Sequence, residues 1–103
     1  MVIFDEVDAG IGGRTADTIG RKLRQVARGR QVISVTHLPQ IACYADHHLQ
    51  VEKTVRAGRT SVRVTPLAGQ ERIREVARML GGETLTETSL RHARELLRSA
   101  QPN

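Results

Sequence analysis

The residues that most constrain the fold are a short apolar run and the acidic residues directly after it. Val2, Ile3 and Phe4 form the run, and Asp5 and Glu6 follow at once. An uninterrupted apolar run of this length is typical of a strand that is buried on both faces of a parallel sheet. A buried central strand needs a neighbour on each side, and this one starts with the first residues. We therefore expect the chain to be part of a larger domain.

The next segments complete a strand, helix, strand unit. Apolar residues recur at helical spacing between residues 16 and 27, and Gly29 should end this helix. A second apolar run from Val32 to Val35 predicts another buried strand. Strands joined by a crossover helix are parallel. Their carboxyl ends should therefore lie at the same edge of the sheet.

The remaining residues predict a short helix, a hairpin and two further helices. Pro39 suits the first turn of a short helix that extends through Tyr44. Valines alternate with polar residues over 48–66, which predicts an antiparallel hairpin. Apolar residues at helical spacing over 73–80 and an N-cap at Thr86 predict the last two helices. The expected fold class is α/β, with two parallel strands, a crossover helix, a β-hairpin and two carboxyl-terminal helices.

Composition narrows the possible partners and the cellular location. The 103 residues carry 16 Lys and Arg against 11 Asp and Glu, a formal charge of +5 that is compatible with DNA or nucleotide phosphates. Cys43 is the only cysteine, which excludes an internal disulfide and fits a reducing compartment. The sequence has no apolar stretch near the ~18 residues of a membrane span and no secretory leader. We expect a cytoplasmic, nucleoid-associated protein.

Two carboxylates and a histidine are predicted to meet at the carboxyl edge of the sheet. Asp5 and Glu6 end the first strand, at the position where open α/β folds bind ligands. In P-loop NTPases an acidic residue there holds Mg²⁺, and a neighbouring carboxylate can orient the attacking water. These roles would fall to Asp5 and Glu6. His37 follows the second strand, can approach Glu6, and could donate a hydrogen bond to a γ-phosphate or to the water.

Other interpretations of these side chains stay open. A strand that runs into a polar loop gives the same short pattern. Asp5, Glu6 and Asp8 could also form a different kind of metal site, since hard cations accept carboxylate oxygens. Zinc is disfavoured because the spacing of its possible ligands fits no paired Cys/His framework. Those possible ligands are His37, Cys43, His47 and His48.

The last two predicted helices are rich in arginine. Solvated helix faces explain such residues most simply, and contact with DNA is the less favoured alternative. The arginines are Arg72, Arg74, Arg78, Arg91, Arg94 and Arg98.

Three segments resemble motifs of ABC-type ATPases. Val2 to Glu6 resembles the Walker B strand, Asp8 to Gly13 the D-loop, and Val35 to His37 the switch-histidine loop. More narrowly, three longer stretches resemble the carboxyl-terminal part of the head of the RecN family, which are SMC-like bacterial DNA repair proteins. These stretches are DEVDAGIGGRTA, SVTHLPQIACYADHH and IREVARMLGGETLTETSLRHARELL. The resemblance covers nearly the whole of residues 1–103.

The family resemblance implies a function and a role for each motif residue. It implies a head that binds ATP and Mg²⁺, pairs with a second identical head around two nucleotides, and engages DNA, with ends expected, in double-strand-break repair and recombination. Asp5 would bind Mg²⁺, Glu6 would be the catalytic base, and His37 would contact the γ-phosphate. The nucleotide-binding positions of the D-loop would be Asp8, at the head interface, with Gly10 and Gly13.

The sequence also departs from the complete family pattern. Gly12 stands where the family usually has a serine, which removes any hydrogen bond of that side chain across the head interface. Neither a GxxxxGK[ST] phosphate loop, nor an LSGGE-like signature, nor a long coiled-coil arm occurs in these residues. We therefore expect no ATPase activity from this chain alone, and we expect a partner segment from the amino-terminal part of the head. A non-catalytic basic DNA-binding module and a purely structural fragment remain the alternatives.

Overall fold

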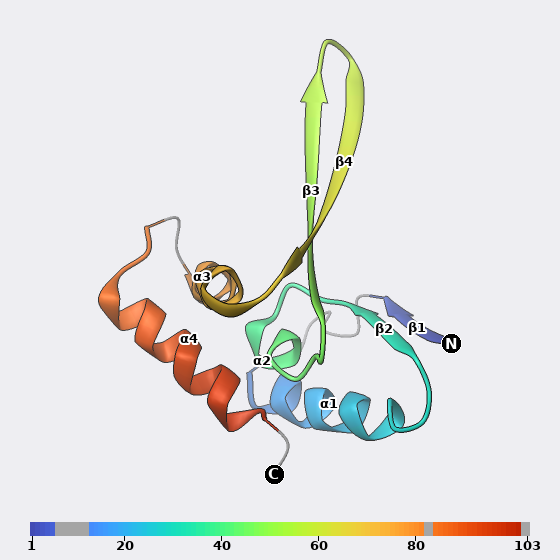
Figure 1. Ribbon diagram of the computed structural model, residues 1–103, viewed down its shortest axis with the longest axis vertical. Coiled ribbons are helices and arrows are strands. Elements are labelled where there is room, and N and C mark those ends of the chain that lie inside the picture. Colours follow the sequence, from blue (N-terminus) through green and yellow to red (C-terminus); the bar gives the residue numbers. More distant parts are fainter. Residues whose placement is uncertain (6–12, 82–83, 102–103) are drawn as a thin grey trace.

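The structure is a computed structural model that describes residues 1–5, 13–81 and 84–101 (Figure 1). Its elements in chain order are β1 (Val2–Asp5), α1 (Gly13–Val26), β2 (Val32–Val35), α2 (Pro39–Ala42), β3 (His48–Arg56), β4 (Arg59–Leu67), α3 (Gly69–Gly81) and α4 (Glu87–Ser99). This order confirms the predicted α/β class. The parallel pair, the hairpin and the two last helices are all present.

β1 and β2 form a two-stranded parallel sheet. Val2 lies opposite Val32 and Asp5 opposite Val35, as the crossover unit predicted. Burial on both faces is not observed, because Ile3 is 60% and Val35 is 52% exposed. Among the described residues β1 pairs with β2 alone, and only the face that carries Val2 is half-buried.

β3 and β4 form a long antiparallel hairpin that projects away from the helices (Figure 1). Its two-residue turn is Ala57 and Gly58, with φ of 50° and 75°. Positive φ at both central residues is the geometry that matches the twist of the flanking strands. The predicted hairpin is confirmed, although its valines remain exposed.

α3 and α4 pack against each other and form one buried cluster of the described chain, and Ala16 of α1 and Ile41 of α2 are also buried. Val76 and Ala77 of α3 and Ala93 of α4 are buried at their contact, surrounded by half-buried leucines and Ile73. Thr86 caps α4 as predicted. Its Oγ1 accepts a hydrogen bond from the Ser89 backbone N–H at 3.0 Å, and Ser89 Oγ accepts one from the Thr86 N–H at 2.9 Å.

α2 is shorter than predicted. It starts at Pro39 as expected but ends at Ala42, and residues 43–44 form a turn instead of extending the helix. Tyr44 leaves the helix because its hydroxyl and its backbone carbonyl both bind side chains of α1. The turn therefore serves to attach α2 to α1.

Candidate functional site

The carboxyl ends of β1 and β2 lie at one edge of the sheet. Asp5 ends β1 opposite Val35, and Thr36 and His37 follow β2 directly. The Asp5 and His37 side chains are both exposed. Parallel pairing thus brings Asp5 and the segment that carries His37 to the same edge, as the sequence predicted.

A tight turn leads from this edge into α2. Thr36 Oγ1 accepts a hydrogen bond from the Leu38 backbone N–H at 3.0 Å. Leu38 is the N-cap residue of α2 and has extended backbone angles. Hydroxyl-to-backbone bonds of this kind fix local turns. The segment between β2 and α2 that carries His37 is therefore held in a defined conformation.

Several of the predicted site residues lie outside the described part of the structure. These residues are Glu6, Asp8 and Gly10, and Gly12, where the sequence departs from the family pattern, lies outside it as well. Gly13, the last position of the D-loop resemblance, is the first residue of α1. Over residues 1–5, 13–81 and 84–101, no three His, Cys, Asp or Glu side chains are grouped so that they could hold a metal ion.

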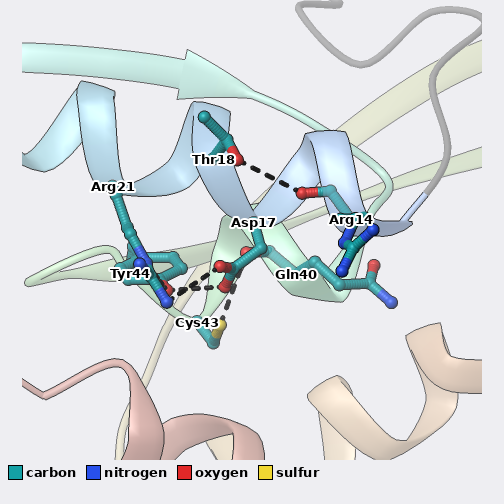
Figure 2. Close-up of polar contacts among 7 residues, drawn as sticks. All are labelled: Arg14, Asp17, Thr18, Arg21, Gln40, Cys43 and Tyr44. Carbon is teal, nitrogen blue, oxygen red and sulfur yellow. Dashed lines mark hydrogen bonds and ion pairs between the residues drawn. The ribbon is translucent and has the colours of Figure 1, made fainter.

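A polar cluster joins α1 to the turn after α2 (Figure 2). The Tyr44 hydroxyl donates a hydrogen bond to Asp17 Oδ1 at 2.6 Å, and Arg21 Nε donates one to the Tyr44 oxygen at 3.1 Å. Arg21 Nη2 also lies 3.2 Å from Asp17 Oδ2. Burial and the hydrogen bond to Asp17 raise the pKa of Tyr44, so the hydroxyl remains a donor at neutral pH.

Two further contacts fix the position of Tyr44 beneath α1. Arg24 Nη2 donates a hydrogen bond to the Tyr44 carbonyl at 2.6 Å, and its guanidinium carbon lies 5.2 Å from the centre of the Tyr44 ring. Gly20 is buried against the same ring, where an added Cβ would overlap Tyr44 Cδ2 and lie 3.1 Å from the Gln40 carbonyl. Gly20 therefore permits the close approach of α1 and α2.

Arg72 of α3 holds the segment after α2 from the other side. Its Nη2 donates hydrogen bonds to the carbonyls of Ala45 at 2.8 Å and Ala42 at 3.3 Å. Cys43 is buried in the same segment, and burial raises its pKa to about 11. A thiol with so high a pKa is a poor nucleophile at neutral pH. Cys43 is therefore a buried side chain that packs within this segment.

A second polar cluster joins α3 to the base of the hairpin. Glu75 is buried and accepts hydrogen bonds from Arg78 Nε at 2.9 Å and from Gln50 Nε2 at 3.0 Å. The carboxylate of Glu75 raises the pKa of Arg78. A buried carboxylate is costly unless it is paired. This pairing ties β3 to the helical core.

The sequence did not reveal these two clusters. The local signals were the helical spacing of Asp17, Arg21 and Arg24 in the first cluster and the i,i+3 spacing of Glu75 and Arg78 in the second. The first set has a distant partner. Their partner Tyr44 is at least 20 residues away in the sequence. Helical periodicity gives no information on a partner at that separation.

Comparison with solved structures identifies the fold. The fold matches a structure from work on ATP-driven dimerization and DNA-stimulated activation of SMC ATPases, with a TM-score of 0.63 and 17% sequence identity. The match covers 80% of this chain and 48% of the other. The fold is therefore that of part of an SMC-type ATPase.

Comparison with curated proteins identifies the relatives more narrowly. The chain is 56% identical over 96 residues to the DNA repair protein RecN of Deinococcus radiodurans, and 52% and 48% identical over 99 residues to those of Streptomyces coelicolor and Bacillus subtilis. These matches cover 93–96% of this chain and lie in the carboxyl-terminal part of RecN. The predicted resemblance to RecN is thereby confirmed.

The chain corresponds to a small share of these relatives. It spans 17% of the length of each of the three RecN proteins. No family model matches the chain. Within its described part, no helix has the length and apolar character needed to cross a membrane.

Proposed function

We propose that this chain supplies the magnesium-binding and water-activating half of an ATP site in an SMC-like DNA repair protein. The observation that carries the proposal is the parallel pairing of β1 and β2. It brings Asp5 and the segment with His37 to one sheet edge, where nucleotides bind in folds of this type. The similarity to RecN supports the context of DNA repair and recombination.

In this proposal each residue at the sheet edge has a separate role in ATP hydrolysis. The exposed carboxylate of Asp5 offers the hard oxygen ligand that Mg²⁺ prefers, and Glu6 takes the proton of the attacking water. His37 donates a hydrogen bond toward the γ-phosphate. When bound, Mg²⁺ offsets the negative charge of the β- and γ-phosphates. The proposed nucleotide and head-interface positions are Asp8, Gly10 and Gly13.

The missing half of the site comes, in this proposal, from the amino-terminal part of the head. Residues 1–103 hold the segments that resemble Walker B, the D-loop and the switch histidine, but no phosphate-loop sequence. The phosphate loop cradles the phosphates through its backbone amides and its lysine. The chain alone should therefore hold ATP weakly and release no phosphate.

Phosphate release tests the proposal directly. The purified chain is assayed alone and after mixing with an amino-terminal RecN segment that carries the phosphate loop. We expect turnover only in the mixture, and Glu6→Gln should lower it by roughly 10²–10⁴-fold, the usual contribution of a general base. Glu6-dependent turnover by the chain alone would show that no second segment is needed.

Matched carboxylate variants test the magnesium role. In the active mixture, Asp5→Asn should raise the Mg²⁺ concentration needed for half-maximal turnover, because an amide is a poorer ligand for a hard cation. Glu52→Gln removes one exposed carboxylate from β3, away from the edge, and should leave that concentration unchanged. An equal shift in both variants would contradict the assignment of Asp5.

The proposal extends to assembly and to DNA. Two heads would pair around two ATP molecules, with Asp8 at the interface, and the assembly would engage double-stranded DNA ends on the nucleoid in the cytoplasm. The ATP-driven dimerization and DNA-stimulated activation of the SMC structural neighbour support this. Sedimentation of the mixture carrying Glu6→Gln should show a dimer that requires ATP.

The net charge favours one alternative function. A formal charge of +5 would suit a non-catalytic module, derived from such a head, that binds DNA through its basic helices. The affinity of such a module for DNA should depend strongly on salt and should not change in Asp5→Ala. Loss of turnover in the Glu6→Gln mixture, with wild-type turnover intact, would exclude it as the sole function.

A further inference from the structure

The helices border a cavity that is separate from the sheet edge. It is open to solvent, has a volume of about 550 Å³, and is lined by residues of α1, α3, α4 and the segment after α2. No residue of β1 or β2 lines it. Among the described residues, its charged lining consists of four arginines and one aspartate: Arg24, Arg72, Arg94, Arg98 and Asp46. The lining is therefore strongly positive.

Two of these arginines are fixed in place by neutral acceptors. Arg24 donates to the carbonyl of Tyr44, and Arg72 donates to the carbonyls of Ala42 and Ala45. Carbonyl oxygens orient a guanidinium without neutralising its charge. Within the described residues, the Nε atoms of Arg24 and Arg72 are buried and have no hydrogen-bond partner. The protein thus holds two positive charges in a half-buried place, where Asp46 is the acidic side chain of the lining and acts on Arg72.

The other two arginines border the same cavity from α4. Arg94 and Arg98 are exposed and lie four residues apart, so they occupy one face of the helix. Like charges at this spacing repel each other. Across the described chain, the ion pairs are Arg21 with Asp17 and Arg78 with Glu75, and neither involves an arginine of the cavity. A bound anion would relieve the repulsion.

We propose that this cavity binds a phosphate group. Guanidinium groups present parallel N–H donors that match two phosphate oxygens, and paired arginines are the usual means of recognising phosphate. Arg24 and Arg72 would contact the phosphate from fixed positions. Arg94 and Arg98 would contact it from α4. The phosphate could belong to a DNA backbone or to a small phosphate compound. This site goes beyond the proposed ATP site, since the two have no residue in common.

Binding of a short DNA duplex, followed by fluorescence anisotropy over a range of salt concentrations, tests the DNA source. The double variant Arg94→Gln/Arg98→Gln should bind on the order of tenfold more weakly, and the slope of log K against log salt should fall by about two. The matched control Arg56→Gln/Arg91→Gln removes two exposed arginines outside the cavity. It should change both quantities much less.

Thermal unfolding in inorganic phosphate, compared with chloride at equal ionic strength, tests the small-molecule source. Phosphate should raise the Tm of the wild type and of the control pair but not that of Arg94→Gln/Arg98→Gln. Stabilisation by phosphate without DNA binding would assign the site to a small phosphate compound. If the cavity pair and the control pair behave alike with both probes, the proposal is overturned.

Two more variants serve as controls for these experiments. Gln101 lines the cavity and is exposed, so Gln101→Glu adds a negative charge there while every arginine remains. Gln101→Glu should weaken DNA binding and reduce the rise in Tm with phosphate. This result remains informative if the arginine double variant folds poorly. Glu6→Gln should leave both readouts unchanged. A failure of the ATP proposal is thereby distinguished from a failure of this one.

Discussion

The helical core and the hairpin place similar apolar residues in opposite environments. Val76 in α3 is fully buried, whereas Val51 in β3 and Val62 in β4 are 63% and 58% exposed. Val76 packs against α4, which follows α3 directly in the chain. The hairpin valines have no such neighbour within the described residues. The comparison teaches that the helices carry their own packing partners, whereas the hairpin leaves its apolar residues exposed among the described residues.

The register shows that the exposed hairpin residues form one face. Val51 lies opposite Val64, and Lys53 opposite Val62, while Glu52 lies opposite Arg63 on the other face. Neighbouring positions of a strand point to opposite sides of a sheet. The exposed apolar residues on the valine face are Leu49, Val51, Val55, Val62 and Val64. The hairpin is therefore amphipathic, with one apolar and one charged face.

Truncation of Val76 should have the largest effect on stability. Val76→Ala removes two methyl groups at a fully buried position, which should lower the free energy of unfolding by about 2 kcal/mol. Urea unfolding followed by circular dichroism measures the change. A loss below about 0.5 kcal/mol, the usual range for surface changes, would mean that the α3–α4 contact is loosely packed.

The close contact between α1 and α2 gives the next largest effect. In Gly20→Ala the new Cβ would overlap the Tyr44 ring and crowd the Gln40 carbonyl, which should cost about 1–3 kcal/mol. The better helix propensity of alanine offsets up to about 1 kcal/mol of this. We expect a net loss of about 1 kcal/mol by urea unfolding.

A matched substitution isolates the contact with Tyr44. Gly29 has a φ of +72° with nothing within 4 Å of an added Cβ, so Gly29→Ala carries backbone strain but no overlap. Gly20→Ala should shift the near-ultraviolet signal of Tyr44, and Gly29→Ala should not. A stabilised Gly20→Ala variant with an unchanged tyrosine signal would contradict the close contact.

The sequence predicted those elements whose signals are local. The apolar runs at Val2 and Val32, the alternating pattern over 48–66 and the cap at Thr86 were each recognisable from neighbouring residues, and the structure contains all the features that they predict. Parallel pairing followed from the chirality and length of the crossover. The edge that joins Asp5 to the His37 segment was predictable for the same reason.

The clusters between elements could not be predicted in this way. The end of α2 at Ala42 depends on the bonds of Tyr44 to α1, and the arginine cavity depends on how four segments pack. Such contacts join residues far apart in sequence, and a periodic pattern shows which face of a helix is buried but not what covers it. The roles of Glu6, Asp8 and Gly10 remain predictions, because these residues lie outside the described part of the structure.

Acidification should weaken the junction between the hairpin and the helical core. The loss in free energy of unfolding should be smaller than that of Val76→Ala or Gly20→Ala. His48 begins β3, and burial lowers its pKa, as does the positive charge of Arg72, although Glu75 opposes them. The unfolded chain then binds the proton more tightly, so stability should fall as the pH drops below about 6.5. His48→Gln should show a smaller fall between about pH 7.5 and pH 5.5, by urea unfolding. His47 is the exposed neighbour of His48, and the free energy of unfolding of His47→Gln should fall over this pH range as that of the wild type does.

The smallest effect is expected on the hairpin, and it completes the comparison with Val76. Val62→Thr keeps the β-branched shape of the side chain, and the position is already 58% exposed, so the free energy of unfolding should change by less than about 0.5 kcal/mol. Self-association should respond more clearly, because the substitution makes the apolar face more polar. Sedimentation at high concentration should show less association for Val62→Thr than for Ser61→Thr, which alters the opposite face. A stability loss near that of Val76→Ala would show that the valine face is covered in the isolated chain, and the contrast between the two regions would then be wrong.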